Sequence, residues 1–289
     1  MTDDRDGEQP AVLTIAGFDP SGGAGIIADV KTFQAFGCRP LAAVTSLTFQ
    51  NSRGVFGAIH QSAESLRAQV LPIIEEVRIA AVKIGMLPTS EIVLAVVRLV
   101  REQNLPAPVV DPVLQSSSGD ELMAEAAIEI MLSELTSLSR VITPNIPEAE
   151  TLTGLKITNE DEMCEAEGKL REMGARAVLV KGGHLIERSE VRGQRSDDLV
   201  PDTKRQAIDV LDDRGQITVF RGEWIDSPPV RGTGCMLSSA IAACLAQRMP
   251  LGESVRAAKQ FVADAIRYAP KLGPDPVTLE LTEMTKLED

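Results

Sequence analysis

The sequence predicts an α/β fold built on a mainly parallel sheet, because short apolar runs alternate with longer amphipathic segments along the chain. The run 11–16 (AVLTIA), for example, is of strand length and is followed, after a glycine-rich loop, by 26–36, whose apolar residues recur with helical spacing. Strands that alternate with helices are joined by right-handed crossovers and lie parallel. Ligands bind such sheets at the carboxyl ends of the strands, so a functional site is expected there.

The remaining elements follow the same alternation. Apolar runs predict further strands at 41–49, 55–60, 79–85, 106–113, 140–144 and 177–183. Helical spacing predicts helices at 64–77, 90–102, 121–135, 163–174, 233–247 and 252–268. Two alternating segments, 207–213 and 215–222, flank a turn and predict an antiparallel hairpin at the edge of the sheet.

The chain is expected to form one domain over residues 11–270, since no internal repeat or linker divides its 289 residues. Residues 1–10 are polar and acidic, which predicts a disordered tail and no signal peptide. Residues 271–289 are expected to be a C-terminal extension. The segment 184–206 is charged and lacks an apolar period, so it is expected to be a surface loop.

Composition excludes several classes of function. With 29 Lys and Arg against 42 Asp and Glu, the net charge is -13, which argues against a binder of nucleic acid or of an anionic membrane. No apolar run approaches the ~18–20 residues needed to cross a bilayer. The four cysteines are far apart and form no CxxC pair, which argues against a zinc ribbon or a disulfide framework and favours a cytoplasmic location.

The segment 231–238 (RGTGCMLS) places two glycines and a cysteine where a polar loop becomes an apolar helix. Glycines let backbone amides converge, and the positive end of a helix attracts an anion, so the segment predicts a phosphate site. Cys235 falls in the first helical turn, where the same field favours a thiolate. A glycine turn before a buried helix with an inert cysteine would show the same residues.

The first glycine-rich loop has an alternative interpretation. Gly23, Gly25 and Ala28 satisfy G-x-G-x-x-A between a strand and a helix, as in a dinucleotide-binding fold. The loop is long for that turn, and no acidic residue ends a second strand ~20 residues on. A loop that covers a small flat substrate is the other interpretation.

Polar residues also follow other predicted strands. They are Gln50 and Asn51, Asp111, Asn145 and Glu148, and Lys181, while Gly85 and Met86 follow another of the strands. Asn145 and Glu148 also have the spacing of a helix capping box, and Asp111 and Lys181 could be surface charges. Together, an acid, an acid–amide pair, a lysine and an anion hole are the parts that phosphoryl transfer requires.

In their order and spacing these segments resemble the hydroxymethylpyrimidine/phosphomethylpyrimidine kinases of thiamin biosynthesis, which are ribokinase-like proteins. The resemblance is carried by AGFDPSGGAGIIADVKTF, QNSRGV, VKIGML, VVDPV, ITPNIPEAE, VKGGH and GTGC. It implies a three-layer α/β/α fold and a homodimer. It also implies MgATP-dependent phosphorylation of 4-amino-5-hydroxymethyl-2-methylpyrimidine, followed by a second transfer onto the monophosphate.

The resemblance implies roles for residues at matching positions. The pyrimidine pocket would comprise Gly17, Asp29, Gln50, Met86 and Val113. Catalysis would involve Cys235 as a base together with Lys181, Gly232 and Gly234 around the transferring phosphoryl group. ATP would be bound by Lys181, Thr233, Asn145 and Arg231, and Mg²⁺ would be held near Asp111 and Glu148.

The chain also departs from the family pattern. Pro228, Pro229 and Arg231 stand near the glycines where the family commonly has a Thr-His pair, and Phe18 and Phe49 add rings near the pocket. The alternatives are therefore a pyridoxal or pyridoxine kinase on the same scaffold, and a regulator that binds the pyrimidine without transferring phosphate. A nicotinamide-dependent oxidoreductase is a third alternative, based on the first glycine loop.

Overall fold

The computed structural model describes residues 9–51, 53–116, 119–183, 206–227 and 230–268. Residues 1–8 of the predicted tail, the C-terminal extension and almost all of the predicted surface loop at 184–206 lie outside the described residues. No helix in the described ranges is long and apolar enough to span a membrane.

Nine strands of the described residues form one sheet in the order β3-β2-β1-β4-β5-β6-β7-β8-β9. The parallel strands are β1 (Ala11–Phe18), β2 (Arg39–Asn51), β4 (Ile79–Ile84), β5 (Val109–Val110), β6 (Val141–Ile142) and β7 (Ala177–Lys181). Antiparallel strands lie at both edges: β3 (Gly54–His60), β8 (Gln206–Asp213) and β9 (Gln216–Glu223). The predicted mainly parallel sheet and its edge hairpin are confirmed.

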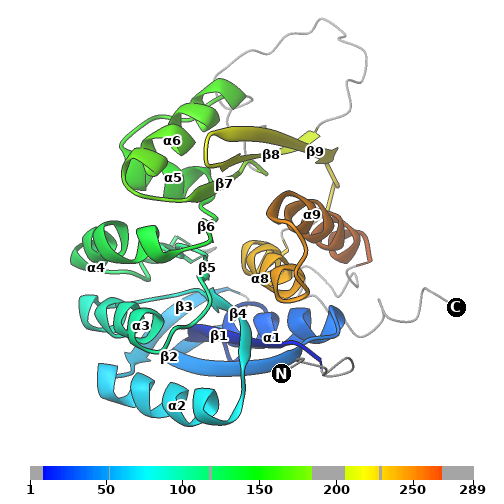
Figure 1. Ribbon diagram of the computed structural model, residues 1–289. Coiled ribbons are helices and arrows are strands. Elements are labelled where there is room, and N and C mark those ends of the chain that lie inside the picture. The colour runs from blue at the N-terminus through cyan, green and yellow to red at the C-terminus, as the bar shows by residue number, and fades with distance from the viewer. Residues whose placement is uncertain (1–8, 52, 117–118, 184–205, 228–229, 269–289) are drawn as a thin grey trace, which may run out of the picture.

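Helices cover both faces of the sheet (Figure 1). One face carries α2 (Ala63–Glu76), α3 (Ser90–Glu102), α4 (Glu125–Ile130), α5 (Ile146–Thr153) and α6 (Glu160–Glu172), which share one apolar core with the strands. The other carries α1 (Gly25–Ala35), α8 (Thr233–Ala246) and α9 (Leu251–Tyr268), which bury a second core. The three-layer α/β/α arrangement is therefore confirmed, and its layers are held by two separate cores.

The helix predicted at 121–135 differs in the structure. It begins at Glu125 and widens into a π-helical turn over Met131–Leu135. The hydroxyl of Thr136 donates to the carbonyl oxygen of Met131 at 3.0 Å, which satisfies a carbonyl inside the widened turn. Helical spacing predicted the segment correctly but could not predict the change in pitch.

A carboxyl group is buried between α6 and the sheet, remote in sequence from the predicted site. Glu167 is fully buried, and its Oε1 accepts a hydrogen bond from the amide of Val180 at 3.4 Å. Its Oε2 has no hydrogen-bond partner among the described residues. Burial raises the pKa of Glu167 to about 9, so the carboxyl is protonated at neutral pH.

Replacing Glu167 with glutamine is expected to flatten the pH dependence of stability. The ordinary pKa of 4.5 applies after unfolding, whereas the folded value is about 9. Between these two pKa values the unfolded chain releases a proton that the folded chain keeps. The free energy of unfolding therefore falls by about 1.4 kcal/mol per pH unit as the pH rises. Thermal unfolding from pH 5 to 9 should show a decline in Tm that is smaller in E167Q. E165Q, an exposed change on the same helix, is the control, and parallel curves for wild type and E167Q would refute the expectation.

Candidate active site

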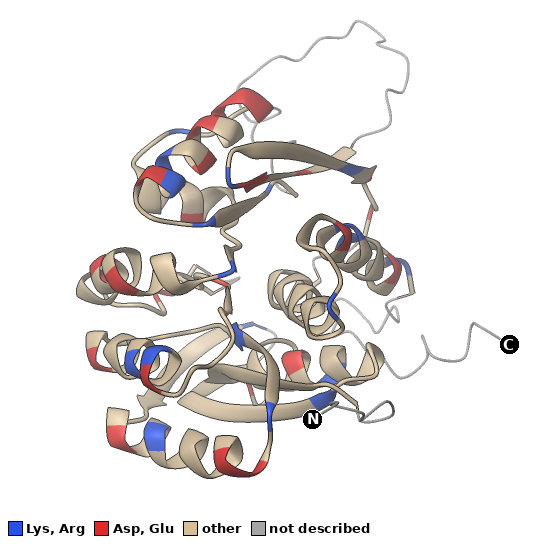
Figure 2. Ribbon diagram, in the orientation of Figure 1, with Lys and Arg blue, Asp and Glu red and all other residues tan. Residues whose placement is uncertain are grey.

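The first turn of α8 presents backbone amides without a capping side chain. Gly232 precedes the helix in a left-handed conformation (φ 77°), and no side chain caps the first turn. The first intrahelical bond runs from the amide of Met236 to the carbonyl oxygen of Gly232 at 2.8 Å, so the amides before Met236 have no partner within the helix. The helix contains no charged residue (Figure 2). Amides without helical partners and the helix dipole make this end suited to binding an anion.

Lys181, at the end of β7, lies beside this helix end. A Cβ atom placed on Gly234 would lie only 3.2 Å from Lys181 Nζ. Burial alone would lower the pKa of Lys181, but the charges of Asp111 and Glu148 raise it above the ordinary value. The ammonium group therefore stays charged next to the amides, and the predicted meeting of Lys181 with the glycine segment is observed.

Asp111, which follows β5, holds this lysine in place. Its Oδ1 lies 2.7 Å from Lys181 Nζ, and its Oδ2 accepts from the hydroxyl of Ser238 at 3.3 Å. Burial alone would raise the pKa of Asp111, but Lys181 and Lys83 hold it below its usual range. The carboxylate thus joins β5, β7 and α8 at one point.

Asn145 and Glu148 form the capping box of α5. Asn145 Oδ1 accepts from the amide of Glu148 at 2.8 Å, and Glu148 Oε2 accepts from the amide of Asn145 at 2.7 Å. The amide of Lys181 donates to the carbonyl oxygen of Pro144 at 2.9 Å, which fixes this cap next to β7. Burial raises the pKa of Glu148 to about 7, although Lys181 opposes the shift. The capping interpretation is correct, and the same carboxyl is electrostatically coupled to the site.

Two residues of the predicted pyrimidine pocket, Gly17 and Met86, are in contact. A Cβ atom on Gly17 would lie 2.9 Å from Met86 Sδ, so a larger residue at this position would displace the Met86 side chain. The hydroxyl of Thr45 donates to the carbonyl oxygen of Met86 at 2.7 Å and fixes the loop after β4. Val113, also predicted for the pocket, is half-buried, and its amide donates to the carbonyl oxygen of Asp111 at 2.8 Å.

The loop before α8 connects this region with the anion site. Arg231 donates to Gln50 Oε1 at 3.3 Å and to the carbonyl oxygen of Asn51, both at the end of β2. Gly232 lies so close to the first glycine loop that a Cβ atom would overlap the carbonyl oxygen of Gly23. Residues at least 180 positions apart are thus in contact, while Pro228 and Pro229 lie outside the described residues.

Known proteins resemble this chain over most of its length. Residues 19–279 match the model of the phosphomethylpyrimidine kinase family. The chain belongs to that family.

Similar proteins include the hydroxymethylpyrimidine/phosphomethylpyrimidine kinase of Streptomyces coelicolor, which is 38% identical over 264 residues, 91% of each chain. The phosphomethylpyrimidine kinase of Clostridium difficile has a similar structure, with a TM-score of 0.74 and 37% identity, covering 89% of this chain and 100% of the other. The Staphylococcus aureus pyridoxal kinase in complex with AMP-PCP and pyridoxal gives a TM-score of 0.82 at 27% identity and covers 97% of each chain.

Membership of the phosphomethylpyrimidine kinase family makes the chain a phosphotransferase. The fold is ribokinase-like, as the resemblance implied. The nicotinamide-dependent alternative is therefore wrong. Gly23, one of the glycines that suggested it, lies against Gly232.

Asp29 does not line an open pocket, contrary to the expectation. It is fully buried on α1, and Lys83 Nζ lies 2.9 Å from both of its carboxylate oxygens. The hydroxyls of Thr14 and Ser239 donate to the same carboxylate at 2.6 and 2.7 Å. Protein donors surround the group, so Asp29 belongs to the interior beneath the site.

Cys235 also differs from the expectation. The sequence predicted a thiol with a lowered pKa, but burial raises the pKa of Cys235 to about 12, and the charges of Asp111 and Asp29 add to the increase. Lys83 and Lys181 act in the opposite sense and do not overcome it. Desolvation therefore outweighs the helix field, and the thiol is protonated at neutral pH.

Iodoacetamide is accordingly expected to label Cys235 slowly at pH 7–8, because the thiolate is the reactive form and a free cysteine has a pKa of about 8.5. Mass spectrometry of the peptide that contains Cys235 gives the rate at each pH, and C235S identifies the labelled peptide. The rate should still be rising at pH 9. A labelling rate that reaches a plateau near pH 7 would contradict the raised pKa and support the thiolate that the sequence predicted.

Lys83 is the main site residue that the sequence analysis missed. It is fully buried on β4, and its charge acts on Asp29, Cys235 and Asp111. The signal was present as a single lysine inside the apolar run IAAVKIG. A buried lysine needs a charged partner, which points to a paired interior group.

Proposed function

We propose that this protein transfers the γ-phosphoryl group of ATP to the hydroxymethyl group of 4-amino-5-hydroxymethyl-2-methylpyrimidine, and then phosphorylates the monophosphate. The position of Lys181 Nζ beside Gly234, at the uncapped end of α8, carries the proposal. An anion at this point meets an ammonium group and free amides together. The names of the sequence relatives support the choice of pyrimidine.

In the proposed reaction the substrate hydroxyl oxygen attacks the γ-phosphorus, a new O–P bond forms, and the bond to the β-phosphate oxygen breaks to release ADP. The hydroxyl proton passes to an oxygen of the transferred phosphoryl group and from there to water. Amides of residues 233–235 stabilise the charge on the equatorial oxygens, and Lys181 neutralises charge as the bond to ADP breaks. Cys235 is protonated at neutral pH, so it is not a ready base for the substrate hydroxyl.

Residues near Lys181 fit a magnesium ion of the kind that kinases use. Mg²⁺ keeps several waters and binds through one or two carboxylates together with substrate phosphates. The described residues contain no cluster of three Asp, Glu, His or Cys side chains that could hold a metal by themselves, which agrees with a site completed by nucleotide. Glu148 and Asp111 would hold the hydrated ion, and Asn145 would keep Glu148 in place. Magnesium would supply charge neutralisation at the phosphates.

Gln50 is proposed to recognise the substrate ring at the carboxyl end of β2. A primary amide carries a donor and an acceptor side by side, which complements an aminopyrimidine edge. Arg231 donates to Gln50 Oε1, which supports a proposed role for this arginine in fixing the amide against the ring. Gly17 and Met86 would form the apolar wall beside it.

Phosphorylation of pyridoxal is the second candidate, because the S. aureus pyridoxal kinase shares the fold at a TM-score of 0.82. The deciding experiment supplies purified protein and MgATP with the aminopyrimidine, its monophosphate, pyridoxal or pyridoxine, and detects mono- and diphosphate products by mass. The proposal expects the highest kcat/KM with the pyrimidine. Preference for pyridoxal would establish the second candidate, and tight binding of the pyrimidine without ADP formation would indicate a regulator.

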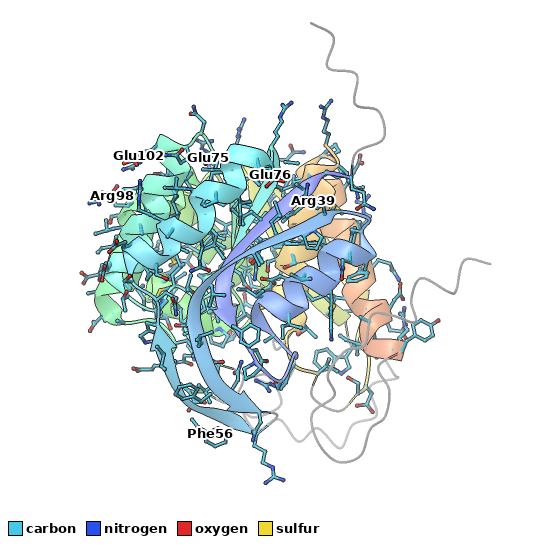
Figure 3. All side chains as sticks on the ribbon, turned by 90° about the horizontal axis from the view of Figure 1, so that it is seen from below. Arg39, Phe56, Glu75, Glu76, Arg98 and Glu102 are labelled. Atoms are coloured by element: carbon cyan, nitrogen blue, oxygen red, sulfur yellow. The ribbon has the colours of Figure 1, made fainter. Side chains whose placement is uncertain are left out.

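A homodimer is proposed through the outer face of the β2–β3 hairpin. Leu47, Phe49, Phe56 and Ile59 are exposed there, and Phe56 lies at the outer side of the hairpin (Figure 3). Light scattering should give a dimer for wild type and a monomer for F56E/I59E. I217E changes an exposed residue on β9, at the opposite edge of the sheet, and should stay dimeric. A dimeric F56E/I59E would refute this interface.

A cytoplasmic location is proposed because all four cysteines are free thiols, as a reducing compartment would keep them.

A further inference from the structure

Two buried ion pairs lie side by side beneath the start of α8. One is Lys181–Asp111, described above, with Nζ and Oδ1 2.7 Å apart. The other is Lys83–Asp29, in which both side chains are fully buried and Nζ lies 2.9 Å from each carboxylate oxygen. The charge of Lys83 reaches both Cys235 and Asp111, so the two pairs form one electrostatic unit.

Helix α8 is attached to each pair by a serine. Ser238 donates to Asp111 Oδ2 at 3.3 Å, and Ser239 donates to Asp29 Oδ1 at 2.7 Å. Ser239 follows Cys235 by four residues, about one helical turn. The two residues therefore lie on the same face of α8. The shorter of these two contacts belongs to the Lys83–Asp29 pair.

Stability alone does not account for a second ion pair here. A buried pair loses so much hydration that apolar residues of similar volume are often equally or more stabilising. A bidentate contact does, however, fix the carboxylate in orientation, and a charged acceptor makes the bond from Ser239 stronger than a neutral one. The arrangement is suited to holding a helix end at a defined position.

We propose that Lys83 is a positioning residue for phosphoryl transfer, acting through Asp29 and Ser239 to hold the first turns of α8 where their amides meet the transferring group. The inference rests on the proposed function, in which that helix end binds the phosphoryl group. Lys83 itself is fully buried and does not touch substrate. Its effect is on the geometry of residues 232–235.

Two matched variants test the proposal. S239A and T14V each remove one fully buried hydroxyl that donates to Asp29, at 2.7 and 2.6 Å, but only Ser239 belongs to α8. S239A should lower kcat about tenfold and leave KM for ATP and for the pyrimidine within about twofold, whereas T14V should leave kcat within about twofold. Hydrogen exchange of residues 232–240 should be faster in S239A and unchanged in T14V.

Equal effects of S239A and T14V on kcat, or an unchanged kcat in S239A, would overturn the proposal, because Asp29 would then need its donors only for folding. A third variant, K83M/D29N, removes both charges without leaving either one unpaired and keeps an oxygen that can accept from Ser239. Its kcat should fall at least as far as that of S239A. A wild-type kcat in K83M/D29N would show that Lys83 does not position α8.

The exchange measurement separates this inference from the proposed function. If wild-type protein phosphorylates none of the heterocycles, the proposed function fails. The hydrogen-exchange rates of α8 in S239A and T14V then test the positioning role without any measurement of activity. Faster exchange only in S239A supports it. Equal exchange in the two variants overturns it.

Discussion

Replacing Lys181 with methionine is expected to lower kcat about 10²–10³-fold, the size of effect found when one preorganised charge-stabilising group is removed. The ammonium group lies beside Gly234 and is held by Asp111 at 2.7 Å, so it is in place before the nucleotide binds. Methionine keeps most of the side-chain volume and removes the charge. KM for the heterocycle should change little, because its proposed pocket lies at Gly17, Gln50 and Met86.

Steady-state kinetics with ATP and the pyrimidine measure this effect. K156M is the matched control, since it removes an exposed lysine beyond α5 and should leave kcat unchanged. K181M also leaves Asp111 buried without its ion-pair partner, so thermal unfolding must show that the variant is folded at the assay temperature. A folded K181M with at least half of the wild-type kcat would exclude Lys181 from transition-state stabilisation.

Replacing Gly232 with alanine is expected to damage both stability and activity. The left-handed conformation costs a non-glycine residue about 1–2 kcal/mol, and forcing extra volume into a packed site typically costs about 1–3 kcal/mol more. The added Cβ would overlap the backbone of Gly23, so the first glycine loop and the start of α8 must separate. Since both segments line the proposed site, kcat should fall together with Tm.

Gly37 supplies the control for this change. Its φ of 68° is close to the 77° of Gly232, but a Cβ atom on Gly37 would meet nothing within 4 Å. G37A therefore carries the backbone strain without the overlap and should lose less stability and no activity. If urea unfolding shows equal losses for G232A and G37A, the close contact with Gly23 is not what requires glycine at residue 232.

Most elements of the fold were predictable because their signals are local. The spacing of apolar residues identified α3 as 90–102, and the alternation around residue 214 identified the β8–β9 hairpin. Chemistry-bearing residues at strand ends were predictable for the same reason. Parallel strands bring their carboxyl ends to one edge of the sheet, so Asp111 and Lys181 were expected at the same edge.

Other properties of the site had no local signal. The pKa of Cys235 was predicted to fall because only the helix was considered, and burial by neighbours from other elements reversed its direction. Asp29 was placed in the pocket by its position in a motif, but its partners Thr14, Lys83 and Ser239 come from β1, β4 and α8. The contacts of Arg231 with Gln50 and Asn51 at the end of β2 join segments that no local pattern connects.

The sequence by itself determined the α/β class, the order of the elements and the set of residue types available for phosphoryl transfer. Hydrophobic periodicity and the positions of glycines are properties of short stretches of sequence. Only the tertiary structure decided which side chains partner each carboxylate and how deeply each carboxylate is buried. The reason is that burial and charge pairing depend on elements that are adjacent in space and as much as 210 residues apart along the chain.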